Sequence, residues 1–199
     1  MMDLEQLSRE DLERTAYHEA GHALFAAKHD MALDAVWVVP SDTDVPARES
    51  TWVGHMSRVS REMFEPYCLA TDLGRAFVGA QLALAGRAAE AIVFEEAEEE
   101  EEARWAVFDD LEGTDLKTLT EALVALSPES DELRAPLAYM LVDLVCSFLV
   151  AKSAALDAIA GALLDSVTHS LEGPEVYRLV DETERAVPAE DAARSAVGS

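Results

Sequence analysis

Basic residues are scarce in this chain. It has 15 lysines and arginines against 40 aspartates and glutamates, which gives a net charge of −25. Only Lys28, Lys117 and Lys152 are lysines. Phosphate groups would be repelled by this excess of negative charge, so we expect neither nucleic acid nor a membrane surface as a partner.

Cysteine and long apolar runs are scarce as well. Cys68 and Cys146 are too few for a disulfide framework and form no C-x-x-C motif, so we expect two buried free thiols. The start of the chain has no signal-peptide pattern. Asp143, Lys152 and Asp157 interrupt the most apolar stretches, which predicts that no segment spans a membrane. We therefore expect a soluble cytoplasmic protein.

The remaining pattern is mainly helical. Half of the residues are hydrophobic, enough for one substantial core. Two β-rich runs, Ala35–Val39 and Thr51–Met56, predict an antiparallel strand pair. Apolar residues at helical spacing predict helices around this pair, listed here in chain order: about 8–28, 69–94, 114–126, 133–150, 153–171, and a last helix from Pro174. We expect one domain over residues 1–187 and a disordered tail over residues 188–199.

The first helix contains the motif H-E-x-x-H at His18, Glu19 and His22. Residues four apart lie on one face of a helix, so both imidazoles can bind the same metal ion. Glu19 projects about 60° from His22 around the axis, close enough to reach a water on that metal. This arrangement is typical of zinc sites in which the glutamate acts as general base.

Three glycines and one serine add local expectations. Gly21 lies inside the motif and costs about 1 kcal/mol relative to alanine in a helix, which predicts that another element approaches there. Gly54 predicts a bulge or a close backbone contact in the second strand. Gly86 either divides the helix over residues 69–94 or marks a helix crossing. Ser8 is a candidate N-cap of the first helix.

These residues resemble the peptidase domain of the FtsH-type (M41-like) zinc metalloproteases. Thr15–Ala23 is similar to the "HEAGHA" helix of that family, Leu84–Glu90 to its "GGRAAE" helix, and Glu112–Leu116 to its "GA-x-N-D-L" segment. The likeness covers most of residues 10–185. It implies a mainly α, zincin-like peptidase domain with a small β-hairpin or sheet.

The sequence departs from that family in two ways. We expect the membrane segments and the AAA ATPase of the family to be absent, and no G-x-x-x-x-G-K-[ST] motif of an ATPase occurs in the sequence. The segment between Phe94 and Asp115 is longer than in the family and strongly acidic, with eight residues of Glu95–Glu102 including seven glutamates. We expect that run to be a solvated loop or helix end.

A catalytic zinc needs a third protein ligand. The family resemblance implies Asp115, and this residue also opens a helix just after a glycine, where its carboxylate can be aimed. Glu90 is the rival ligand, although it could equally form an ion pair with Arg87. Asp109 and Asp110 are further candidates.

The sequence therefore predicts a zinc metalloendopeptidase that cleaves short or unfolded peptide segments. Zn²⁺ would be held by His18, His22 and Asp115, with Glu19 as the base. A separate unfoldase would have to deliver folded substrates, since the chain has no ATPase motif. The alternatives are a catalytically silent peptide-binding or scaffold protein of the same fold, and a module whose acidic face binds a basic protein.

Overall fold

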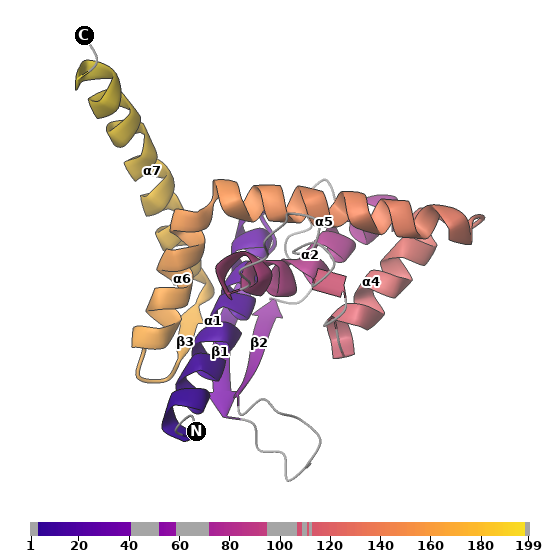
Figure 1. Cartoon of the computed structure of the whole chain (residues 1–199), viewed down its shortest axis with the longest axis horizontal. Helices are drawn as coiled ribbons and strands as arrows, with labels where there is room; N and C mark the ends of the chain where they lie inside the picture. Colours follow the sequence, from indigo (N-terminus) through magenta and orange to yellow (C-terminus); the bar gives the residue numbers. More distant parts are fainter. Residues whose placement is uncertain are drawn as a thin grey trace.

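A computed structural model describes residues 4–40, 52–58, 72–94, 107–108, 111 and 113–197. The protein is mainly helical, with one small antiparallel sheet (Figure 1). The helices are α1 (Leu4–Lys28), α2 (Asp72–Phe94), α4 (Gly113–Leu126), α5 (Arg134–Ala151), α6 (Ser153–Asp165) and α7 (Gly173–Val197). The strands are β1 (Leu33–Pro40), β2 (Trp52–Arg58) and β3 (Ser170–Glu172). This confirms the predicted fold class at the level of a mainly α chain with a small sheet.

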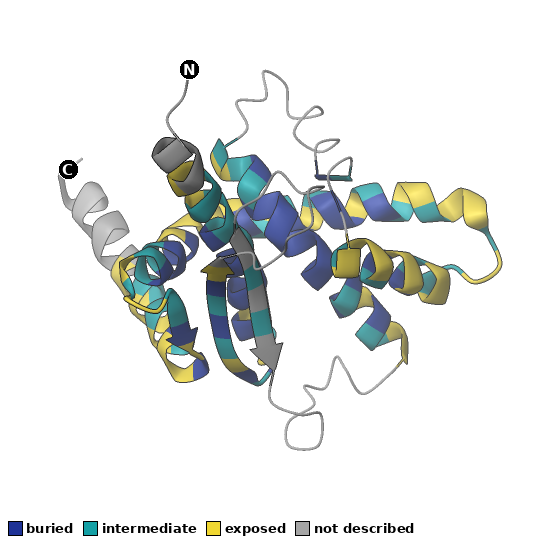
Figure 2. Ribbon diagram, turned by 90° about the horizontal axis from the view of Figure 1, so that it is seen from below, coloured by how far each residue is buried: buried dark blue, intermediate teal, exposed yellow. Residues whose placement is uncertain are grey.

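The core forms where α1 crosses α2. Both helices bring alanines to this crossing, and Ala20, Ala23, Ala85 and Ala88 have no exposed surface. Small side chains let the two backbones approach closely. Figure 2 shows this buried centre, with the outer ends of α4 and α5 exposed to one side of it.

The glycines explain how close the crossing is. A β-carbon on Gly21 would overlap the carbonyl oxygen of Ala85, so the expected close approach at Gly21 is confirmed. Helix α2 continues without a break through Gly86, whose own position faces α1. Gly86 therefore marks a helix crossing and does not divide the helix.

The predicted pairing of the first two strands is confirmed, and a third strand joins them. The strand order is β2-β1-β3, and both pairings are antiparallel. Val36 and Val38 of β1 face the core, while Val39 is exposed, as expected for a sheet with one buried face.

The sequence prediction was wrong about residues 166–171, which were expected to continue the helix from Ser153. Helix α6 ends at Asp165, and Ser166 adopts an extended conformation. His169 has a positive φ of 46° and turns the chain back, and its carbonyl accepts a 2.8 Å hydrogen bond from the Val38 N–H. This pairing with β1 is a long-range contact that helical spacing could not reveal.

Both chain ends are more helical than expected. Helix α1 begins at Leu4, so Ser8 lies inside the helix and is not its N-cap. The residues before Ser8 are Leu4-Glu5-Gln6-Leu7, which are good helix formers and extend the helix past the predicted start. Helix α7 runs to Val197, through most of the segment that was expected to be a tail, and it projects from the body (Figure 1).

Glu184 ties α7 to the rest of the protein. Its Oε1 lies 2.8 Å from Nζ of Lys28, at the end of α1, and 2.8 Å from Nζ of Lys152, between α5 and α6. Hydrogen bonds from both lysines lower the pKa of Glu184 to about 2. Nearby, the Tyr177 hydroxyl donates a 2.5 Å hydrogen bond to the Met31 carbonyl.

Within the part of the chain that the structure describes, two helical segments are long and apolar enough to cross a membrane by length and composition, which corrects the expectation that charged residues leave no such segment. The apolar window of Asp72–Phe94 is 67% buried, because α2 is the central core helix. The window of Asp131–Ala151, which includes α5, is 28% buried. Large apolar side chains exposed along it are Leu133, Met140, Leu144 and Val150.

Replacing Gly21 with alanine should lower the free energy of unfolding by about 1–3 kcal/mol, because the new methyl group would collide with the α2 backbone. Gly79→Ala is the matched control, since Gly79 is also inside a helix but has open space where its β-carbon would lie. That change should stabilise the protein by about 0.5–1 kcal/mol. Chemical denaturation would measure both values, and a stabilising Gly21→Ala would contradict the close crossing.

Candidate metal centre

Three side chains from two distant parts of the chain converge beside the helix crossing. His18 Nε2 and His22 Nε2 of α1 lie 3.0 Å apart. Oδ2 of Asp115, in the first turn of α4, lies 3.5 Å from the first nitrogen and 3.3 Å from the second. Among the described residues, His18, His22 and Asp115 form the one group of this kind that could hold a metal ion.

The other ring nitrogen of each histidine is already engaged. Nδ1 of His18 lies 2.6 Å from Oε1 of Glu90, and Nδ1 of His22 lies 2.8 Å from the Leu82 carbonyl oxygen. Both acceptors require a proton on Nδ1, which leaves the Nε2 lone pairs directed at the same point. Histidine ligands of metal sites are commonly held in this way by a carboxylate or a carbonyl.

The spacing of the three converging atoms fits a zinc ion. Tetrahedral zinc with bonds of about 2.0–2.2 Å places neighbouring ligand atoms roughly 3.4 Å apart. The three separations here are 3.0, 3.3 and 3.5 Å. Two nitrogen lone pairs 3.0 Å apart and an adjacent carboxylate repel one another unless a cation lies between them. A proton or a metal ion can supply that charge.

Two glycines keep space for the site. A β-carbon on Gly86 would lie 2.5 Å from Nε2 of both histidines, so any larger residue would intrude on the converging atoms. Gly113 has a φ of 57°, in the left-handed region that glycine adopts without strain. It starts α4 two residues before Asp115, in agreement with the predicted glycine turn.

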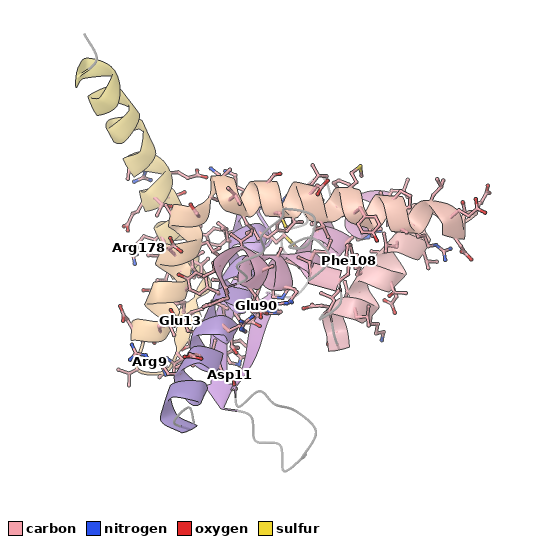
Figure 3. All side chains as sticks on the ribbon, viewed as in Figure 1. Arg9, Asp11, Glu13, Glu90, Phe108 and Arg178 are labelled. Carbon is pink, nitrogen blue, oxygen red and sulfur yellow. The ribbon has the colours of Figure 1, made fainter. Side chains whose placement is uncertain are left out.

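Glu90 is not part of the converging group, although the sequence made it the rival ligand. Its Oε1 binds the far nitrogen of His18, and its Oε2 lies 3.2 Å from Nη1 of Arg87 and 3.6 Å from Nη1 of Arg14. Figure 3 shows Glu90 beside α1, toward the inside of the molecule. The alternative in which Glu90 pairs with Arg87 therefore describes its contacts better than a ligand role does.

Glu19 is buried between α1 and the sheet, with 5% of its surface exposed. A β-carbon on Gly54 of β2 would overlap the Glu19 side chain, so the glycine in the strand marks a close approach, as predicted. The proposed base is thus held against the backbone of β2.

Asp109 and Asp110, the remaining candidate ligands, lie outside the described residues, as do Glu95–Glu102 and Cys68. Cys146, which was expected to be buried, is half-buried.

Sequence reasoning missed Arg14 and the Leu82 carbonyl. Arg14 precedes His18 by four residues and therefore shares its helix face, which was a signal available from the sequence. The role of Leu82 depends on a backbone oxygen in another helix, and no side-chain pattern reveals it. These two groups complete the surroundings of the histidines.

Neighbouring groups strongly shift the pKa values of His18 and Asp115. Burial lowers the pKa of His18, but hydrogen bonds to Asp115 and Glu90 outweigh burial and raise it to about 10. Burial raises the pKa of Asp115, yet hydrogen bonds to His18 and His22 hold it well below its usual range. Without a metal, His18 is therefore protonated at neutral pH and lies opposite an ionised Asp115.

No protein-family model matches the chain, and no curated protein resembles it at a significant level.

Zinc binding at about pH 8 should release close to one proton, because His18 stays protonated until a pKa of about 10 and the metal must displace that proton. Titration calorimetry in buffers of different ionisation enthalpy measures this number. The same shift makes His18 stabilise the metal-free fold fully below its unfolded pKa of 6.5 and lose this contribution as the pH rises toward about 10. Asp115→Asn removes one partner of the imidazolium and should reduce the proton release. An unchanged release in that variant would refute the coupling.

Proposed function

We propose that this chain is a zinc-dependent metalloendopeptidase with a zincin-like, FtsH-type peptidase fold. The observation that carries the proposal is the convergence of His18, His22 and Asp115, with the opposite nitrogen of each imidazole already bonded. Two nitrogens and one carboxylate oxygen form a common ligand set of catalytic zinc, and they leave a position for water. His18 and Asp115 keep about a quarter of their side-chain surfaces exposed, so a substrate can reach that position.

The chain's own residues would divide the work of peptide hydrolysis. When bound, zinc supplies a water of lowered pKa and a positive charge for the developing oxyanion. Glu19 takes the proton of the attacking water and returns it to the leaving amine. Glu90 and the Leu82 carbonyl hold the two imidazoles in the tautomer that binds metal.

The position of β2 supports a peptide substrate. Among the described strands, β2 has a single neighbour, β1, so it is an edge of the sheet. An extended peptide can add to such an edge through backbone hydrogen bonds. Gly54 of the same strand packs against Glu19, which would bring a paired peptide beside the base. Short or unfolded segments suit this mode, and a separate unfoldase would be needed for folded proteins.

The alternative function is a silent peptide-binding or scaffold protein. Burying a carboxylate costs free energy, and a scaffold gains nothing from a buried Glu19 beside a histidine pair. This cost favours the enzyme. We also propose a cytoplasmic location, and neither nucleic acid nor a membrane as a partner, because the net charge of −25 would repel phosphate groups.

Glu19→Gln should keep zinc at about one per chain but reduce casein hydrolysis at least ~100-fold, because an amide cannot accept the proton of water. Glu13→Gln is the matched control, since Glu13 is an exposed glutamate on the same helix. Fluorescent casein cleavage and native mass spectrometry measure the two quantities. Full turnover by Glu19→Gln would rule out its role as base, and a folded wild-type protein that binds no zinc would rule out the enzyme.

The choice of third ligand predicts different metal losses in two variants. Asp115→Ala should lose zinc to a mild chelator at concentrations that wild type withstands, because two imidazoles remain. Glu90→Gln should lose less zinc, with an affinity reduced about 10-fold, because Glu90 affects the site only through its hydrogen bond to His18. Zinc stoichiometry after dialysis against the chelator compares them. If Glu90→Gln instead bound zinc more weakly than Asp115→Ala did, Glu90 would be the ligand.

A further inference from the structure

The carboxylate of Glu90 is divided between two kinds of partner. One oxygen, Oε1, accepts the hydrogen bond from His18 Nδ1 at 2.6 Å. The other, Oε2, faces the guanidinium groups of Arg87 at 3.2 Å and Arg14 at 3.6 Å. Each oxygen therefore has its own direction, and together they fix the orientation of the carboxylate.

Of the two arginines, Arg87 is the one built into the interior. Its side chain is 6% exposed, against 42% for Arg14, and Glu90 itself is 13% exposed. An ion pair that is screened from water holds its geometry much better than an exposed one. Arg87 also lies three residues before Glu90 on α2, so both partners of the pair belong to the same helix.

A fixed Glu90 matters because a carboxylate next to a cation site is itself a ligand for that cation. Glu90 touches one of the three converging residues through the ring nitrogen that faces away from the site, so a loose Glu90 would leave the ring of His18 free to turn. We propose that Arg87 is a positioning residue that holds Glu90 on Nδ1 of His18 and away from the metal face. This inference rests on the proposed metal site, but its first test does not use metal.

A merely structural role for Arg87 predicts something different. It would change the stability of α2 without changing the hydrogen bond of His18 or the affinity for zinc. The test therefore compares Arg87→Met, which removes the charge at similar length, with Arg87→Lys. The contact is made through a single nitrogen, Nη1, so a lysine at the same spacing can replace it. Circular dichroism and thermal unfolding show that each variant is folded.

The first measurement is nuclear magnetic resonance of the metal-free, isotope-labelled protein. The Nδ1 proton of His18 should give a downfield signal in wild type, because it lies in a short hydrogen bond to a carboxylate. The signal should persist in Arg87→Lys and in Arg14→Gln, and disappear in Arg87→Met through exchange with water. A signal that persists in folded Arg87→Met would overturn the proposal, whether or not the protein binds zinc.

The second measurement is zinc affinity by competition with a chelator. Arg87→Met should weaken binding about 10-fold, and Arg87→Lys should restore most of it. If Arg87 acts through Glu90, the same Arg87→Met change should have less than about a 2-fold effect in a Glu90→Gln background. Equal losses in both backgrounds would overturn the proposal. A wild-type protein without zinc would instead refute the proposed function and leave the resonance test decisive for Arg87.

Discussion

The close crossing of α1 and α2 is the constraint on which the rest of the structure depends. Gly21 on one helix and the Ala85 carbonyl on the other leave no space for an additional carbon atom. This distance brings Glu90 and Leu82 of α2 within hydrogen-bond reach of the two histidines on α1. A wider crossing would break both bonds and release the rings into several orientations. The contacts that pack the core therefore also orient the two histidines.

The second organising feature is the alternation of charge around the histidines. The chain as a whole is strongly acidic, yet the arginines Arg14 and Arg87 lie at this site. They compensate Glu90, while the imidazoles compensate Asp115. A divalent cation could therefore take the place of the His18 proton opposite Asp115, while Arg14 and Arg87 continue to compensate Glu90.

Local patterns predicted the local structure well. The histidine pair on one helix face, the two strands and the glycine at a helix crossing all follow from periodicity and side-chain size within a few residues. The failures involve contacts between distant segments. β3 forms because residues 170–172 pair with β1, although the segment reads as a helix end. Likewise, Glu90 could be a ligand or a partner of Arg87 by sequence, and the choice depends on which nitrogen of His18 it meets across the crossing.

The Glu184 carboxylate has a practical consequence for chemical labelling of the protein. It engages Lys28 and Lys152, two of the three lysines, each 2.8 Å from one carboxylate. Both side chains are taken up in ion pairs with the same carboxylate, which hinders their reaction with an electrophile. Lys117 is 75% exposed and meets Glu121 only at 4.0 Å. It is therefore the most exposed of the three lysines for an amine-reactive fluorophore, two residues from Asp115 on α4.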